Sequence, residues 1–162
     1  MLISLSGLPG TGKSTVARLV ARQLGAVWLR IDSIEQPMNR AGFVVEGVGY
    51  EIAQSIARDN LSVGRTVIAD CVNPWPLTRD TWRSVGEDLH VRVLEIEFVC
   101  TDSGEHQRRA ENRREVDPGC PSWQDILNRD YRPWNRDRIV IDTAQTTSEE
   151  AASMLIGAAQ EG

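Results

Sequence analysis

The sequence has 162 residues, of which 41% are hydrophobic and 25% charged, which predicts one globular domain spanning residues 1–162. A formal net charge of −5 argues against a protein that binds nucleic acid through a general excess of positive charge. No apolar run approaches the roughly 20 residues that cross a bilayer. The first residues do not resemble a signal peptide, and three cysteines without a CxxC pair indicate reduced thiols, so we expect a cytoplasmic protein.

Short apolar segments alternate along the chain with segments of helical period, which is typical of an α/β fold with a mainly parallel sheet. In chain order, the first half predicts strand Leu2–Ser6, helix Lys13–Leu24, strand Ala26–Ile31, helix Gly47–Leu61 and strand Arg65–Ala69. The second half predicts helix Thr78–Asp88, strand Val91–Val99, helices Ser103–Arg114 and Ser122–Asp130, strand Arg138–Ile141 and helix Ser148–Ala159.

Local signals at the ends of these elements support the assignment. Gly25 and Gly64 suit the left-handed conformation that often closes a helix. The segment 73–76 contains two prolines and cannot continue the third strand. The last helix is predicted to begin at Ser148, without an acidic residue at position 151 to complete a capping box.

The segment between the first strand and the first helix matches G-x-x-x-x-G-K-[ST]. Glycines let backbone N–H groups approach phosphate oxygens, and the following helix directs the positive end of its dipole at them. We expect Lys13 to reach the β- and γ-phosphates of ATP and the Ser14 hydroxyl to bind Mg²⁺. The residues expected to contact the nucleotide here are Gly7, Leu8, Pro9, Gly10, Thr11, Gly12, Lys13, Ser14 and Thr15.

Three classes of P-loop protein share such a loop, and the rest of the chain distinguishes them. A GTPase would carry Asn-Lys-x-Asp and Asp-x-x-Gly motifs, and neither occurs in the sequence. A large ATPase would need more chain and a long strand ending in paired acids, whereas Cys71 follows Asp70. A small-substrate kinase needs the loop, an acid near the γ-phosphate and arginines that close over it. The sequence has candidates for each and therefore predicts a kinase.

Acidic and amide side chains follow the second and third strands. Asp32 is predicted at the end of the second strand, where a carboxylate could accept the proton of an attacking hydroxyl; the alternative is a helix N-cap. Asp70 is predicted to hold Mg²⁺ or to bind the substrate. Asn73 is predicted to hydrogen-bond the substrate, and the alternative is ordinary Asn-Pro turn chemistry.

Four arginines, at positions 108, 109, 113 and 114, lie on a polar helix before a Pro- and Gly-rich break. A spacing of four residues puts Arg109 and Arg113 on one face. We expect Arg113 to neutralise charge in the transition state and Arg109 to bind the nucleotide. The alternative is a solvated charged face, because glutamates are interleaved at 105, 111 and 115. Trp75 and Trp134, in Pro-bounded loops, are candidates to line a substrate pocket.

The segments 5–15, 30–35, 66–70 and 111–113 together resemble P-loop kinase-like ATP-binding proteins of the AAA_33 type. The branch is that of chloramphenicol phosphotransferase, zeta toxin and the polynucleotide 5′-kinase domain. The resemblance implies a three-layer P-loop NTPase fold, a parallel five-stranded sheet in the order 2-3-1-4-5 and a short lid at about 103–121. It also implies ATP with Mg²⁺, Asp32 as general base and arginines from the lid. Relatives that act on polynucleotide ends carry an arginine one turn after the base, where this chain has Glu35 and Gln36.

The sequence therefore predicts an ATP-dependent kinase that phosphorylates a hydroxyl group of a small molecule, of antibiotic, sugar or nucleotide type. Two alternatives remain open. One is a polynucleotide 5′-hydroxyl kinase, which the acidic composition disfavours. The other is a non-catalytic ATP-binding regulator or resistance protein that sequesters its ligand.

Overall fold

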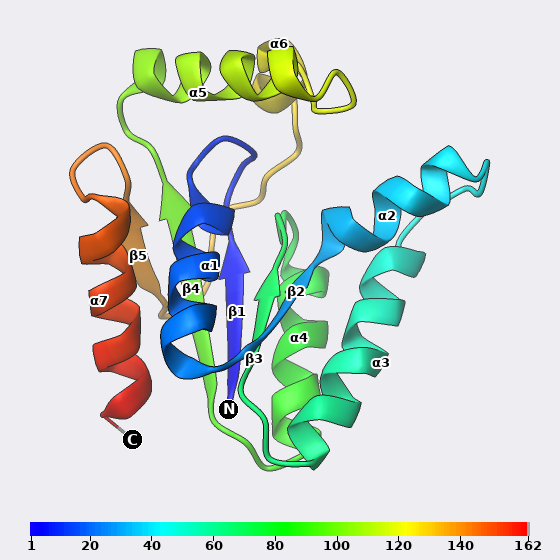
Figure 1. Cartoon of the computed structure of the whole chain (residues 1–162), viewed down its shortest axis with the longest axis vertical. Helices are drawn as coiled ribbons and strands as arrows, with labels where there is room; N and C mark the ends of the chain where they lie inside the picture. The colour runs from blue at the N-terminus through cyan, green and yellow to red at the C-terminus, as the bar shows by residue number, and fades with distance from the viewer. Residues whose placement is uncertain (162) are drawn as a thin grey trace.

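Five parallel strands form one sheet in the order β2-β3-β1-β4-β5 (Figure 1), which confirms the predicted order. The computed structural model describes residues 1–161. The strands are β1 (Leu2–Ser6), β2 (Val27–Arg30), β3 (Val67–Asp70), β4 (Val93–Val99) and β5 (Ile139–Asp142).

β1 lies at the centre of the sheet, between β3 and β4. In this register Leu5 pairs with Asp70 on one side and with Ile96 on the other. Because all pairs are parallel, the carboxyl ends of the strands meet at one edge. The segments that follow β1, β2 and β3 therefore start side by side, at the place where open α/β sheets bind ligands.

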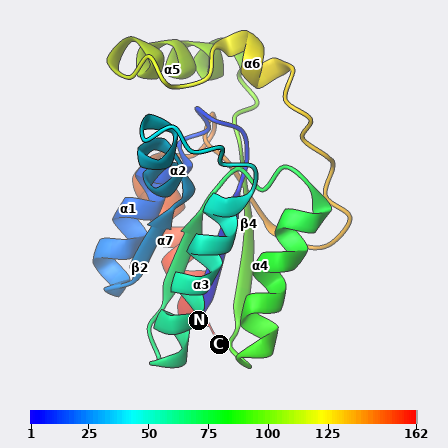
Figure 2. The same cartoon turned by 90° about the vertical axis from the view of Figure 1, so that its right-hand side faces the viewer.

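Helices cover both faces of the sheet (Figures 1 and 2). α1 (Lys13–Leu24) and α7 (Ser148–Gln160) pack on one face, and α3 (Val48–Ser62) and α4 (Pro76–Asp88) pack on the other. Side chains of β1 alternate between the two faces of the sheet. Ile3 and Leu5 belong to the core under α1 and α7, and Leu2 belongs to the core under α3 and α4. All three side chains are fully buried, a contribution of about 1.5–3 kcal/mol each.

Two further helices, α5 (Ser103–Val116) and α6 (Trp123–Leu127), lie across the carboxyl edge of the sheet and not on either face (Figures 1 and 2). We call residues 103–127 the lid. His106 and Ala110 are the buried residues of α5, which is why that helix is polar on almost every side. The start of β1 and the end of α7 lie toward the opposite edge (Figure 1). Within residues 1–161, no helix combines the length and apolar character needed to span a bilayer.

The segment after β2 differs from the prediction. It forms a helix, α2 (Ile31–Arg40), so that Asp32 is the second helical residue and not the end of a strand. The N-cap is Arg30, without a side-chain capping bond, so the alternative of Asp32 as N-cap is wrong as well. Ile31 and Ile34 pack against the core under α3, and this burial stabilises a helix that Pro37 disfavours locally.

The last helix, α7, begins at Ser148 as predicted, but its cap differs from the prediction. Thr147 is the N-cap of α7, and its hydroxyl accepts a hydrogen bond from the Glu150 backbone N–H at 3.2 Å. The Glu150 side chain bonds back to Thr147, which completes a capping box one residue earlier than predicted. At the first helix, Gly25 adopts the predicted left-handed conformation, with φ of 61°.

Candidate functional site

The loop between β1 and α1 wraps closely against β4 and the lid. Gly7 has φ of 130°, and a Cβ at this position would lie 2.2 Å from the carbonyl oxygen of Phe98. Gly10 has φ of 86° and faces the ring of His106. Both positions need a residue without a side chain, which explains why the motif has glycine there.

Lys13 begins α1 and is the only lysine of the chain. Its ammonium donates a hydrogen bond to the Leu8 carbonyl at 3.0 Å, across the loop. Burial lowers the pKa of Lys13 from 10.5 to about 8, and the charges of Asp70 and Asp32 offset this only in part. The amine is therefore held in a confined position, where a bound anion would favour its charged form.

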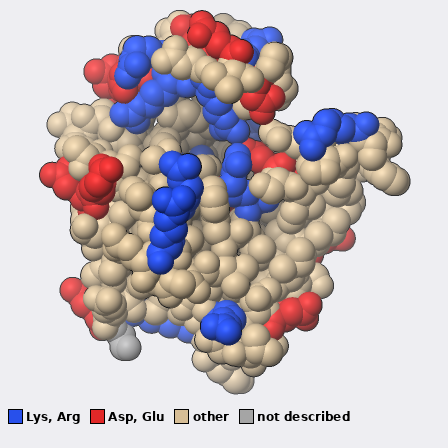
Figure 3. Space-filling view, viewed as in Figure 1, with Lys and Arg blue, Asp and Glu red and all other residues tan. Residues whose placement is uncertain are grey.

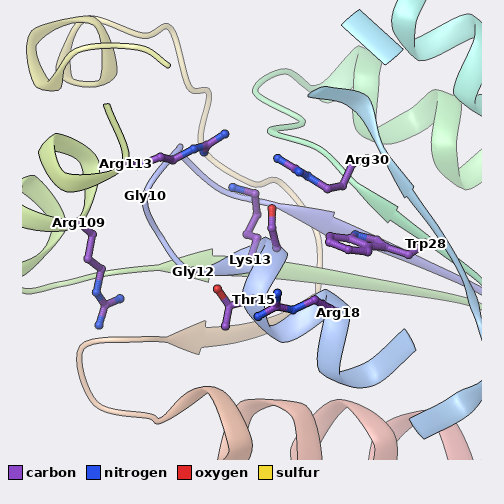
Figure 4. A pocket seen from close by; sticks show the side chains of 10 residues that line it. Gly10, Gly12, Lys13, Thr15, Arg18, Trp28, Arg30, Arg109 and Arg113 are labelled. Carbon is purple, nitrogen blue, oxygen red and sulfur yellow. The ribbon is translucent and has the colours of Figure 1, made fainter. Parts of the chain in front are cut away.

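A cavity of about 400 Å³ opens above this loop; we call it the loop cavity. Five cationic side chains line it, and no carboxylate is among its lining residues in the described chain: the cations are Lys13, Arg18, Arg30, Arg109 and Arg113. In Figure 3, positive side chains gather around the hollow beneath the lid. Figure 4 shows Arg30 and Arg113 extending toward each other above Lys13. Such a convergence of cations and helix N-terminus suits a polyphosphate.

Asp32 joins three elements at the edge of the loop cavity. Its Oδ2 accepts a hydrogen bond from Arg113 of the lid at 2.9 Å and one from Arg30 at 3.1 Å. The predicted acid and the predicted lid arginine are thus brought together, although 81 residues separate them in the chain.

Asp70 is buried at the end of β3. Its Oδ2 accepts a hydrogen bond from the indole of Trp28 at 3.1 Å and lies 3.8 Å from the Arg30 guanidinium. Asp70 and Ser14 line a neighbouring cavity of about 150 Å³, which we call the carboxylate cavity. Its other acidic lining residues are Asp32 and Glu35.

The chemistry of Ser14 and Asp70 fits a magnesium ion that is held mainly by nucleotide phosphates. Mg²⁺ in kinases keeps several waters and takes one or two protein oxygen ligands besides the phosphates. Ser14 supplies a hydroxyl and Asp70 a carboxylate to the same cavity. Residues 1–161 contain no cluster of three or more His, Cys, Asp or Glu side chains that would hold a metal alone.

Arg109 and Arg113 project into the loop cavity, but they have different partners. Arg109 forms an ion pair with Glu105 at 2.7 Å and donates to the hydroxyl and carbonyl oxygens of Thr143. It also lines a cavity of about 460 Å³ formed by Gly12, Thr15 and residues 143–148, which we call the β5–α7 cavity. Arg108 is 63% exposed, as expected for a solvated charge.

His106, to which the sequence assigned no role, joins the lid to the loop. Its Nε2–H donates a hydrogen bond to the Pro9 carbonyl at 2.7 Å, and its ring packs edge-on against Trp123 of α6. No local motif surrounds it in the sequence. His106 contacts the phosphate-binding loop only because the lid folds over that loop.

Asn73 lies apart from the other predicted site residues. Its amide donates to the Leu5 carbonyl at 2.9 Å and to the Ser4 hydroxyl at 3.2 Å, inside the sheet. The backbone here has φ of 46°, a conformation that asparagine tolerates. The left-handed backbone suits a turn, whereas the two long-range hydrogen bonds give the Asn73 side chain a structural role against β1.

A buried arginine fixes the loop that follows Asn73. Arg79 of α4 is fully buried, and its guanidinium lies 4.4 Å from the centre of the Trp134 ring. Its nitrogens donate to four backbone carbonyls, those of Asn73, Pro74, Arg132 and Pro133. Trp134 therefore packs on this arginine, whereas Trp75 is 47% exposed.

The prediction missed three residues of the loop cavity: Arg18, Trp28 and Arg30. Weak signals for them exist in the sequence. Arg18 follows Ser14 by one helical turn, and Trp28 and Arg30 have the two-residue spacing of one strand face. Such spacings are common, so they gain meaning only once the loop and β2 are known to lie side by side.

Known proteins resemble this chain along most of its length. The family model of the AAA domain AAA_33 matches residues 2–121. The probable adenylyl-sulfate kinase of Aeropyrum pernix is 27% identical over 171 residues, which cover 96% of this chain and 90% of the relative.

Two solved kinase structures share the fold. The Mycobacterium tuberculosis APS kinase in complex with AMPPNP and APS superposes with a TM-score of 0.73 at 19% identity, covering 95% of this chain and 94% of that one. A sugar kinase from Janibacter sp. HTCC2649 gives a TM-score of 0.71 at 18% identity, covering 96% and 92%. At these identities the likeness establishes the fold, and function has to be argued from the site.

Proposed function

The chain belongs to the AAA_33 family of AAA domains, and from that premise we propose that it is an ATP-dependent kinase that phosphorylates a hydroxyl group of a small molecule. The observation that carries the proposal is the position of Asp32. This carboxylate lines the cavity next to the phosphate-binding loop and is held by Arg113 and Arg30. Phosphate-binding groups and a proton acceptor thus meet at one point, which is what hydroxyl phosphorylation requires.

In this proposal the triphosphate of ATP lies in the loop cavity, on the backbone of residues 7–15. Lys13 and the N-terminus of α1 stabilise the β- and γ-phosphates, and Arg113 neutralises charge that develops on the transferred group. The nucleoside extends into the β5–α7 cavity, with Arg109 at the boundary because that side chain lines both spaces.

Ser14 and Asp70 would hold the magnesium ion that accompanies ATP, because both reach the carboxylate cavity beside Lys13. When bound, the ion neutralises phosphate charge and orients the γ-phosphate. Trp28 and Arg30 would orient Asp70 through its Oδ2, which both of them contact, and Oδ1 takes part in neither contact.

The transfer itself uses residues on both sides of the γ-phosphate. The acceptor hydroxyl oxygen attacks the γ-phosphorus, the bond to the β-phosphate oxygen breaks and ADP leaves. The hydroxyl proton passes to Asp32. For this to occur, the bound phosphate has to draw Arg113 away from Asp32, since the two now form a direct ion pair at 2.9 Å.

The relatives support a small-molecule acceptor. The Aeropyrum pernix relative is named as a probable adenylyl-sulfate kinase, and the Mycobacterium tuberculosis kinase was solved with AMPPNP and APS. Both names describe a kinase with a small acceptor, and the second also names the ATP analogue AMPPNP. We extend that general chemistry, and not the particular acceptor, to this chain; an antibiotic, a sugar or a nucleotide-type alcohol are the classes to test.

A screen of γ-phosphate transfer tests the proposal. Purified protein is incubated with Mg²⁺ and ATP labelled at the γ-phosphate, together with panels of metabolites, antibiotics and 5′-hydroxyl oligonucleotides. We expect incorporation into a small alcohol and none into the oligonucleotides at low salt. Tight ATP binding without transfer to any panel would contradict the kinase function and favour an ATP-binding regulator.

A further inference from the structure

A further space extends from the carboxylate cavity, away from the phosphate-binding loop. This outer cavity has a volume of about 340 Å³ and shares Glu35, Tyr50 and Arg129 with the carboxylate cavity. The carboxylate cavity in turn shares Lys13 with the loop cavity. The three cavities therefore adjoin in this order, and the carboxylate cavity, with Asp32 in its lining, lies between the outer cavity and the loop cavity.

The charge of the lining changes sign along that path. The loop cavity carries five cations and, within the part of the chain that is described, no lining carboxylate. The outer cavity carries the carboxylates of Glu35 and Glu51 against a single guanidinium, that of Arg129. An anion is attracted to the first space and meets a net negative charge in the second.

Glu35 is a half-buried carboxylate that lacks a protein partner. Across residues 1–161 its side chain forms neither an ion pair nor a hydrogen bond, although it lines both cavities. Burial and the neighbouring charge of Asp32 raise the pKa of Glu35. A partly buried carboxylate in this position gains most from a hydrogen-bond donor that enters with a ligand.

The backbone of α3 leaves room for this side chain. A Cβ on Gly49 would lie 2.4 Å from Cγ of Glu35 and 2.6 Å from its Oε1. Glu35 therefore packs over a glycine, which fixes its carboxylate at the wall of the cavity. The fit between α2 and α3 positions Glu35 without using the carboxylate oxygens.

The remaining wall of the outer cavity is largely apolar. Tyr50, Leu77 and Trp75 contribute to it, and Leu77 is 70% exposed. The indole N–H of Trp75 donates to Asp130 at 3.1 Å, which orients the ring. An oriented and half-exposed indole presents a flat face on which an apolar part of a ligand can pack.

From these contacts we infer that the outer cavity binds the phosphate acceptor, a small alcohol with a hydrogen-bond donor for Glu35, an apolar face for Trp75 and no anionic group. The hydrogen-bond donor of this alcohol is a second hydroxyl or an ammonium group, and a carboxylate can accept a hydrogen bond from either. A phosphorylated sugar or an adenylyl sulfate would instead place negative charge beside Glu35 and Glu51. This inference rests on the proposed kinase function.

The experiment measures transfer of labelled γ-phosphate to three sets of alcohols matched in size. One set carries an amine, one is uncharged and includes aromatic and polyhydroxyl members, and one carries a phosphate, sulfate or carboxylate. We expect transfer to members of the first two sets only. A preference for amines over uncharged alcohols would identify an ammonium group as the hydrogen-bond donor to Glu35. Equal transfer to both sets would identify a hydroxyl group.

Two variants test the assignment of Glu35 and Arg129 with the best acceptor found. Glu35→Gln keeps the shape but weakens a charge-assisted hydrogen bond, so we expect KM for the acceptor to rise roughly 10-fold or more, with KM for ATP unchanged. Arg129→Gln should leave KM for the acceptor within about threefold, whereas an anionic acceptor would lose affinity strongly. Glu46→Gln, at an exposed carboxylate between α2 and α3, is the matched control.

The outcomes separate the two proposals. Transfer confined to anionic alcohols, together with a loss of affinity in Arg129→Gln and none in Glu35→Gln, would overturn the acceptor class and leave the kinase function intact. Transfer to none of the three sets, despite ATP binding, would overturn the kinase function and the acceptor class with it.

Discussion

The nucleotide side and the acceptor side of the site meet at Lys13 and Arg113, yet they are built in different ways. The nucleotide side consists of one short segment after β1 and cations that converge on it from α1, β2 and α5. The acceptor side is assembled from α2, α3, the loop after β3, the first turns of α4 and Arg129 just after the lid, and it contains most of the carboxylates.

The two sides also differ in how their charges are satisfied. The loop cavity is lined by cations and, among the described residues, by no carboxylate, but three of these cations (Arg30, Arg109 and Arg113) form ion pairs with carboxylates outside its lining, so an anionic ligand has to compete with those partners. On the acceptor side Asp32 and Asp70 already have protein partners, and Glu35 has none in the described chain. A local segment suffices to bind a common phosphate, whereas selecting one acceptor requires contacts from several elements. Four predictions test this comparison.

The largest effect is expected from Lys13→Ala, which removes the central cation of the nucleotide side. Phosphoryl transfer should fall by more than ~10³-fold because the charge on the β- and γ-phosphates loses its buried counter-charge. Arg22→Ala, at an exposed arginine on the same helix, is the control and should change the rate little. Steady-state assays measure both, and transfer retained within threefold in Lys13→Ala would contradict the assignment of the loop.

Asp32→Asn tests the boundary between the two sides. The amide keeps the size of the side chain but cannot accept a proton, so transfer should fall roughly 10³-fold while ATP binding persists. Nucleotide affinity from calorimetry and transfer rates from the labelled assay separate these effects. Asp59→Asn, an exposed aspartate of α3, provides the control. A variant that still transfers phosphate at the normal rate would refute the role of Asp32 as base.

Arg79→Met tests the support of the acceptor side. It removes donors to four backbone carbonyls, and we expect a free energy of unfolding about 3 kcal/mol lower. In the folded fraction KM for the acceptor should rise, and KM for ATP should not. Urea denaturation gives the stability. The exposed Arg58, paired with Asp88 at 3.2 Å, is the comparison, and Arg58→Met should cost less than about 1 kcal/mol. Equal losses of unfolding free energy in Arg79→Met and Arg58→Met would contradict the role of Arg79 in supporting the acceptor side.

The smallest effect concerns pH. The pKa of Lys13 is lowered from 10.5 to about 8, so the amine loses its proton as the pH rises above 8. Because bound phosphate favours the charged amine, ATP affinity should fall by up to about tenfold per pH unit above that value. Below pH 8 the amine is charged and its contribution to affinity is complete. Calorimetric titrations between pH 7 and about 9.5 measure this, and a flat profile would contradict the lowered pKa.

The sequence anticipated the elements whose signals are local. The phosphate-binding loop follows from glycines that the backbone itself requires, as the contact of Gly7 with Phe98 illustrates. The positions of the strands and of most helices follow from apolar periodicity, although β2 and β4 are each two residues shorter than predicted, and the order of the sheet followed from resemblance to P-loop kinases. Arg113 was placed on the correct helix, and its contact with Asp32 was found only in the structure.

Prediction failed where packing outweighs local preference. α2 has apolar residues at helical spacing (Ile31, Ile34 and Met38), but Pro37 interrupts this short segment and no helix was predicted there; burial of Ile31 and Ile34 against α3 stabilises it. His106 gave no signal either, because the carbonyl that it binds belongs to Pro9, 97 residues away.

The sequence by itself thus determined a phosphate-binding loop, its lysine and hydroxyl, and an α/β sheet, because each depends on the conformation of adjacent residues. The tertiary structure alone decided what surrounds that loop. It brought Arg18, Trp28 and Arg30 to the nucleotide side, turned Asn73 into the sheet and placed Glu35 over Gly49 on the acceptor side. Such contacts depend on the distance between chain segments in space, and no periodicity within one segment contains that information.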